Sequence, residues 1–139
     1  NGLPAILDAP PGTSCPVIAT LRGVDFALLV TEPTPFGLHD LKLAVAMVRE
    51  IALAFGVIVN RMGIGDGRIH EYCQEQHIPI LLEIPDDRRI AEAYSQGRLI
   101  VEALPEYRGL FERLIKTIEN RIHAGRLYAA STSVTKGQS

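Results

Sequence analysis

The stretch GVIVN at residues 56–60 indicates the fold more clearly than any other part of the sequence. Its first four residues are apolar without interruption, which is typical of a strand covered on both faces, as in a parallel sheet. The run FALLVT at residues 26–31 has the same character. Shorter runs at residues 5–8 and 79–84 are interpreted as two more strands, so the sequence predicts a sheet of about four strands.

Helical patterns separate these runs and follow the last of them. The longest helix is expected over residues 38–55, where apolar residues recur at helical spacing and Gly56 supplies a stop signal. Asp86 is the expected N-cap of a later helix. The other expected helices cover residues 17–21, 69–76, 88–96 and 107–122. This alternation predicts an α/β fold, a partial doubly wound parallel sheet with flanking helices.

Composition excludes several classes of protein. The chain has 139 residues, with 14 Lys and Arg against 16 Asp and Glu, so its formal charge of -2 disfavours both nucleic-acid binding and an acidic disordered chain. No apolar run approaches the roughly 18 residues of a membrane span, and no basic segment marks a signal peptide. With two separated cysteines a disulfide framework is excluded, and a cytoplasmic location is expected.

The expected domain covers residues 1–123, and the small, polar residues 124–139 are expected to form a disordered tail. The sequence has no initiator Met and becomes apolar at Leu3, whereas natural termini are usually loose. We therefore expect the chain to be a piece of a longer protein.

The segment ILDAPPGT at residues 6–13 carries the strongest chemical signal. Asp8 would stand at the tip of an apolar strand, where its carboxylate could hold a magnesium-bound water. Two prolines stiffen the chain after Asp8, and Gly12 lets the backbone N–H approach a phosphate oxygen. The alternative is a rigid turn in which Asp8 only caps the chain locally.

Four segments together resemble the MinD/ParA-type P-loop ATPases, most closely the subgroup that carries an inserted ferredoxin domain. They are DAPPGTSCP at residues 8–16, TEPTPFGLHDL at 31–41, VIVNR at 57–61 and EIPDD at 83–87. The first resembles the switch II segment of the family, and the third resembles the strand that ends in its adenine-binding Asn. Order and spacing match over about residues 3–120, and the resemblance implies that residues 1–123 are the C-terminal part of such an ATPase domain.

The resemblance implies a role for individual residues. Asp8 would hold the water bound to Mg²⁺, and Gly12 would sense the γ-phosphate as switch II moves. Asn60 would form hydrogen bonds with the adenine edge, and the backbone of Pro85 and Asp86 would flank the base.

Partners and cofactors follow from the same resemblance. Glu32 and Asp40 would lie near the interface of a nucleotide-dependent homodimer. The longer protein would be an ATPase that uses ATP and Mg²⁺ and carries [4Fe–4S] clusters in the inserted domain, with a role in iron–sulfur or electron-transfer chemistry. An iron–sulfur or electron-transfer protein is therefore a possible partner.

Residues 1–139 contain neither the glycine- and lysine-rich phosphate loop of the family, nor its switch I aspartate, nor four-cysteine cluster motifs. Without the phosphate loop, this chain should be inactive and bind ATP no tighter than millimolar. Two alternatives remain open, a non-catalytic dimerisation or interaction module and a related P-loop ligase or amide-transfer enzyme.

Three weaker signals have simpler explanations. The glycines at residues 63–67 suggest a dinucleotide loop, but Arg68 occupies the position of its last glycine. His70, Cys73 and His77 share a helix face, yet the two histidines are too far apart for one zinc ion, which favours a solvated face. Cys15 begins a helix, so it is either a reactive thiol or a packed small residue.

Overall fold

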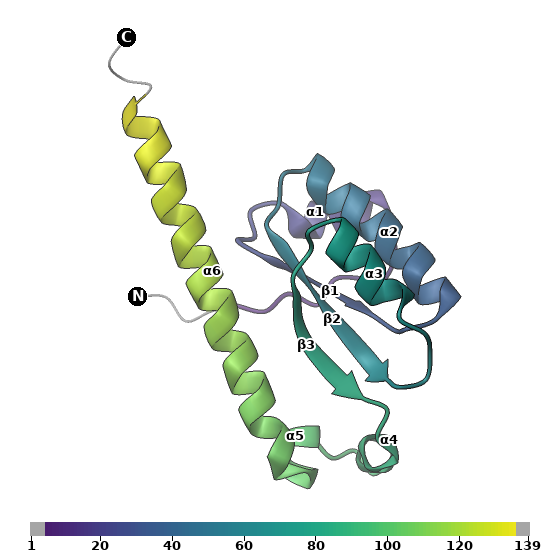
Figure 1. Cartoon of the computed structure of the whole chain (residues 1–139). Helices are drawn as coiled ribbons and strands as arrows, with labels where there is room; N and C mark the ends of the chain where they lie inside the picture. Colours follow the sequence, from purple (N-terminus) through teal and green to yellow (C-terminus); the bar gives the residue numbers. More distant parts are fainter. Residues whose placement is uncertain (1–4, 136–139) are drawn as a thin grey trace. The chain divides into compact units, whose positions relative to one another are not determined.

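A computed structural model describes residues 5–135 of the chain, and the side chains of residues 5–127. The chain divides into two compact units, Asn1–Ile84 and Pro85–Ser139 (Figure 1). The predicted domain boundary at residue 123 stays a prediction.

The first unit alternates helices and strands, as the sequence predicts. Its strands form one sheet in the order β1, β2, β3, and β1 runs parallel to β2 with Leu29 opposite Val57 and Thr31 opposite Val59. The α/β fold with a parallel sheet is thereby confirmed. The elements are α1 (Cys15–Leu21), β1 (Ala27–Thr31), α2 (Pro35–Glu50), β2 (Phe55–Met62), α3 (Arg68–Glu75) and β3 (Ile80–Pro85).

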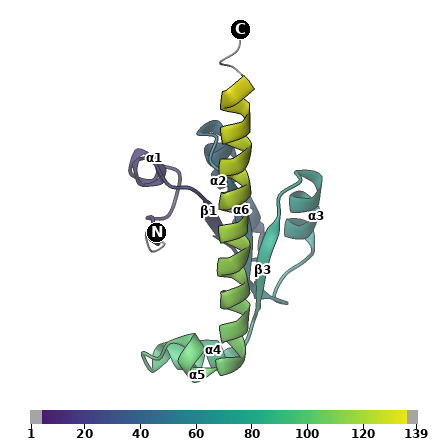
Figure 2. The ribbon, with the colours of Figure 1, turned by 90° about the vertical axis from the view of Figure 1, so that its left-hand side faces the viewer.

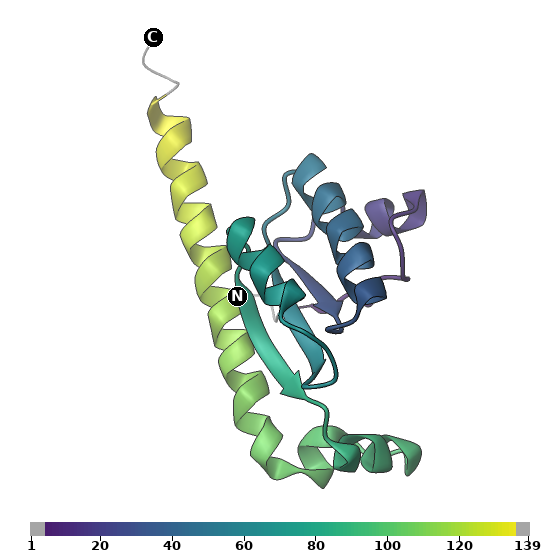
Figure 3. The ribbon, with the colours of Figure 1, turned by 45° about the vertical axis from the view of Figure 1, so that its right-hand side comes forward.

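The core of this unit lies between the sheet and two helices. In Figures 1 and 3, α2 and α3 cover the same face of the sheet, and α1 lies beside α2. Alternate residues of each strand point to this face, so the covered side chains of β2 are Val57 and Val59, both fully buried. They pack with Leu41 and Val45 of α2 and with Ile69 of α3. This packing therefore joins a layer of two helices, α2 and α3, to the sheet through β2.

The expected strand over residues 5–8 is absent. Residues 5–10 have no regular secondary structure, and Ile6 and Leu7 are exposed. The sheet therefore has three strands among the described residues, not four. A strand exists only where a neighbour accepts its hydrogen bonds, and an apolar run without such a neighbour stays irregular.

The helix expected over residues 38–55 lies earlier in the chain than predicted. It begins at Pro35, where the Thr34 side chain accepts a hydrogen bond from the Gly37 N–H, and it ends at Glu50. Ala52 takes a left-handed conformation, with φ of 54°, and the Leu53 N–H bonds back to the Val48 carbonyl. This arrangement ends a helix as glycine does, so the predicted stop at Gly56 was wrong.

The second unit is helical (Figure 2). It contains α4 (Arg88–Ser95), α5 (Ile100–Ala103), the 3₁₀ helix η1 (Pro105–Tyr107) and α6 (Arg108–Thr135). The expected tail is helical as far as Thr135, in keeping with its Ala and Leu content, and residues 136–139 lie outside the described residues. No helix in the described part of the chain is both long enough and apolar enough to cross a membrane.

One edge of the sheet is open to pairing. Within residues 5–135, β1 pairs with β2 alone, and its Val30 side chain is 65% exposed. An unpaired apolar edge is a template for another chain. We therefore expect this chain to self-associate, and Val30→Lys to give a monomer, because a charged edge residue opposes strand addition. Light scattering after size exclusion measures the mass directly.

Leu43→Lys is the matched control, because Leu43 is 48% exposed but belongs to α2 and not to the edge. That variant should self-associate like the unmodified chain. A monomeric unmodified chain at high concentration would contradict the prediction.

Candidate functional site

The loop after β1 is held in one conformation by its own side chains. The Thr31 hydroxyl donates to the Gly37 carbonyl over 3.0 Å, and the Gly37 N–H donates to the Thr34 hydroxyl over 3.0 Å. A Cβ at Gly37 would lie 2.1 Å from the Glu32 carbonyl oxygen, so only glycine fits there. The segment that the family resemblance singled out is therefore a rigid loop at the carboxyl end of β1.

The loop after β2 packs directly against it. A Cβ at Gly65 would lie 1.4 Å from the Pro33 carbonyl oxygen, which shows how closely the two backbones approach. An Arg61 guanidinium nitrogen lies 3.8 Å from the Glu32 carboxylate. The carboxyl ends of β1 and β2 thus form a continuous polar edge, which is where parallel sheets bind ligands.

Asn60 stands at this edge. It is half-buried near the end of β2, and the next residue, Arg61, has a left-handed backbone with φ of 56°. A non-glycine residue in this region carries backbone strain, which concentrates at binding sites. The left-handed backbone of Arg61 therefore sets the direction in which the chain leaves Asn60.

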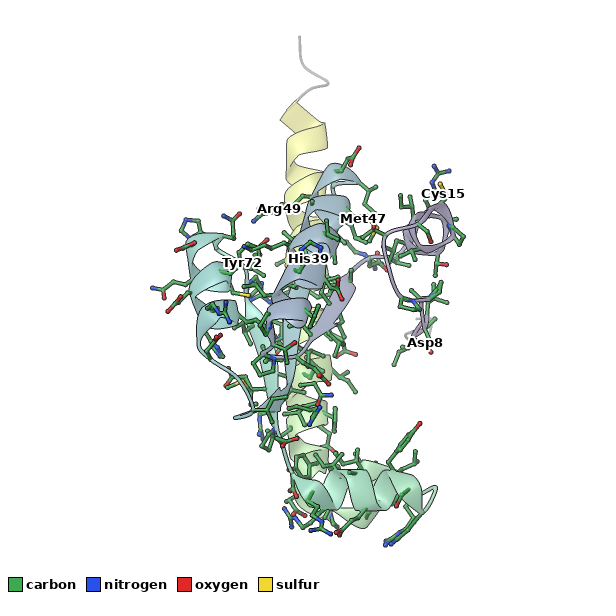
Figure 4. The ribbon with its side chains drawn as sticks, turned by 90° about the vertical axis from the view of Figure 1, so that its right-hand side faces the viewer. Asp8, Cys15, His39, Met47, Arg49 and Tyr72 are labelled. Carbon is green, nitrogen blue, oxygen red and sulfur yellow. The ribbon has the colours of Figure 1, made fainter. Side chains whose placement is uncertain are left out.

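Asp8 and Gly12 are not brought to this edge. Both lie in an exposed segment ahead of α1, and in Figure 4 Asp8 stands apart from the three strands. The expectation that Asp8 ends a strand is therefore wrong, for want of a neighbouring strand. Gly12 does have a left-handed backbone, with φ of 98°, so the turn needs glycine there.

The residues expected at a dimer interface lie in the first unit. Glu32 is half-buried in the locked loop, whereas Asp40 is exposed on α2 next to His39, which Figure 4 labels. Their proposed role stays a prediction.

Pro85, the last residue of β3 and the first of the second unit, and the next residue, Asp86, are both exposed. Asp87 and not Asp86 is the N-cap, because its carboxylate accepts the Arg89 N–H over 2.9 Å. Hydrogen bonds from Arg89, assisted by one from Tyr107, hold the pKa of Asp87 far below its usual range. Burial, and the same bond to Asp87, raises the pKa of Tyr107.

Of the histidine and cysteine signals, only Cys73 lies in the core. His70 pairs with Glu83 of β3, and Cys73 is 1% exposed in the core, where burial raises the pKa of its thiol. His77 is exposed and takes a left-handed conformation at the end of α3. Cys15 is exposed, so its interpretation as a packed residue was wrong.

The described residues do not by themselves form a binding site for the Mg²⁺ ion or the [4Fe–4S] clusters that the resemblance implies. No cluster of three or more His, Cys, Asp or Glu side chains in residues 5–127 could hold a metal ion. Asp8 is a single exposed carboxylate, and one exposed and one buried cysteine cannot ligate an iron–sulfur cluster.

Sequence reasoning missed two features. The close approach of Gly65 to Pro33 has only the glycine itself as a signal, and that glycine suggested a dinucleotide loop instead. The bond between Tyr107 and Asp87 joins residues 20 positions apart, so no local pattern could reveal it.

Comparisons with known proteins agree with this architecture. No protein-family model matches the sequence. An uncharacterized protein of Methanocaldococcus jannaschii is 37% identical over 92 residues, which cover 66% of this chain and 31% of that protein. An iron-sulfur cluster carrier protein of Aquifex aeolicus is 32% identical over 116 residues, which cover 73% of this chain and 32% of that protein. This chain thus spans about a third of the length of these two curated relatives.

Two solved structures share the fold. The cell division ATPase MinD of Pyrococcus furiosus superposes with a TM-score of 0.65 at 28% identity, covering 81% of this chain and 50% of that one. The MinD cell division protein of Aquifex aeolicus gives a TM-score of 0.64 at 17% identity, covering 80% and 51%.

The parallel sheet, with helices on one face and polar loops at the carboxyl ends of β1 and β2, defines an α/β protein of the class that binds ligands at this edge. Within that class, the relatives and the MinD structures support a MinD/ParA-type P-loop ATPase. The resemblance noted in the sequence is thereby confirmed.

Proposed function

We propose that this chain is the base-binding part of a longer MinD/ParA-type ATPase, in which a phosphate loop outside residues 1–139 holds most of the ATP. The observation that carries the proposal is the half-buried Asn60 at a rigid strand end, beside the locked loop of residues 31–37. An Asn amide both donates and accepts hydrogen bonds, as recognition of the adenine edge requires.

The other roles follow the family resemblance. Pro85 and Asp86 flank the base through their backbone. Asp8 holds the Mg²⁺-bound water, and Gly12 responds to the γ-phosphate. In the described structure Asp8 ends no strand, so both roles require residues 5–12 to join a sheet. Glu32 and Asp40 contribute to a homodimer interface.

The longer protein handles iron–sulfur clusters in this proposal. Its support is that relatives from Aquifex aeolicus and Pyrococcus horikoshii, at 32% and 25% identity, are named iron-sulfur cluster carrier proteins. The clusters would bind outside this chain, since Cys15 is exposed and Cys73 is buried.

Titration of this chain with ATP and with GTP, followed by amide NMR, tests the base-binding role. ATP should shift the Asn60 and Asp86 amides with a millimolar dissociation constant, and GTP should shift them less. Asn60→Ala should remove the difference, because the amide that distinguishes the bases is lost. Asn120→Ala is the matched control, since Asn120 is exposed on α6.

Two results would contradict the proposal. Equal responses to ATP and GTP would show that the chain does not recognise the base. Micromolar ATP binding would show that residues 1–139 already contain the main phosphate-binding element.

The open edge of β1 favours a second candidate function, a non-catalytic interaction module. Self-association without any nucleotide response would support this candidate over the first.

A further inference from the structure

The start of α4 carries more hydrogen bonds than a helix cap needs. The Asp87 carboxylate accepts the Arg89 backbone N–H over 2.9 Å, and this single bond already satisfies the cap. It also accepts the Arg89 guanidinium, with the shortest contact at 2.6 Å. The Asp87 side chain is only 16% exposed, so its position is closely determined.

Two residues of η1 complete the network. The Tyr107 hydroxyl donates to the Asp87 carboxylate over 2.9 Å, and Arg89 donates to the Glu106 carboxylate over 2.9 Å. Tyr107 as a whole is 4% exposed, so its burial restricts the position of its hydroxyl. Asp87 is thus tied to a rigid point in a different element of the same unit.

Much of this network contributes little to folding. The side chains of Arg89 and Glu106 are 57% and 53% exposed, and exposed ion pairs stabilise proteins only weakly. The network instead restricts the position of the backbone around Asp86. Pro85 has φ fixed by its ring and ends β3, while Asp87 is anchored on the other side, so Asp86 is held between two fixed residues.

We propose that Tyr107, acting through Asp87, is a positioning residue that holds the backbone of Pro85 and Asp86 in the conformation that contacts the adenine base. This inference rests on the proposed base-binding function. Its physical basis is that hydrogen bonds weaken steeply with small changes of distance and angle, so a base edge is recognised only by a backbone held still.

Tyr107→Phe tests the inference, because it removes one hydroxyl and leaves the buried ring in place. The readout is the ratio of the dissociation constants of this chain for GTP and ATP, measured by amide NMR. We expect the variant to lose about tenfold in ATP affinity, the equivalent of one hydrogen bond, with GTP affinity unchanged. Glu106→Gln, which keeps the Tyr107 bond, should have a smaller effect.

Tyr94→Phe is the matched control, since Tyr94 lies on α4 and is 85% exposed. It should leave both affinities unchanged. If the unmodified chain prefers ATP and the Tyr107→Phe variant keeps this preference, the inference about Tyr107 is wrong and the proposed base-binding function stands. Equal losses for ATP and GTP would also overturn the inference about Tyr107, since they indicate general structural damage. An unmodified chain without any preference would overturn the proposed function and this inference together.

Discussion

Replacing Gly65 with alanine is expected to destabilise the first unit by about 3 kcal/mol, the upper end of the usual cost of overpacking. The added Cβ would lie 1.4 Å from the Pro33 carbonyl oxygen and 2.6 Å from its carbonyl carbon. Both are backbone atoms, so no side-chain rotation relieves the clash. The loops after β1 and β2 must separate, and urea unfolding followed by circular dichroism measures the loss.

Gly67→Ala is the control for this prediction. Gly67 lies two residues further on, has φ of -78°, and a Cβ there would meet nothing within 4 Å. Gly67 is the N-cap of α3, where glycine is preferred to alanine, so its substitution should cost only about 1 kcal/mol. If both variants lost the same stability, the close approach of Gly65 to Pro33 would not be what constrains the loop. Separation of the two loops should also move Glu32 away from Arg61, which links this substitution to the proposed nucleotide edge.

Ile69→Ala is expected to cost about 4 kcal/mol of unfolding free energy, within the range measured for buried Ile and Leu truncations. Ile69 is 1% exposed and packs in one cluster with Val59, Cys73 and Ile78. The truncation leaves a cavity between α3 and the sheet that close-packed neighbours fill only in part. The urea midpoint should fall accordingly, with an unchanged slope.

Ile64→Ala provides the comparison, because Ile64 is 38% exposed and lies in the loop before α3. It should lose about 1 kcal/mol or less, as expected for a side chain that stays partly in water. Similar losses for the two variants would mean that α3 is not packed on the sheet as described.

The sequence predicted helices and strands correctly where their apolar residues pack against other elements of the fold. The apolar run at residues 56–60 is part of β2, and the helix predicted at 69–76 is α3 within one residue at each end. The run at residues 5–8 looked equally strand-like but has no neighbour to pair with, so it forms no strand. Local pattern reports the preference of a segment, and only a partner strand satisfies its backbone.

The candidate site was predictable in part. Asn60 was singled out by the family resemblance of residues 57–61, and it lies near the end of β2. The cap at Asp87 was missed in favour of Asp86, because adjacent acids give the same signal in a sequence. The roles assigned to Asp8 and Gly12 stay predictions.

The sequence by itself determined the fold class and the family, because uninterrupted apolar strands and ordered short motifs are local properties that survive without coordinates. Only the tertiary structure decided that Gly65 abuts Pro33, that Tyr107 anchors Asp87 and that Asp8 stands outside the sheet. The physical reason is that these contacts join segments far apart in the chain. Their geometry depends on how all the packed elements meet, which no single stretch of residues encodes.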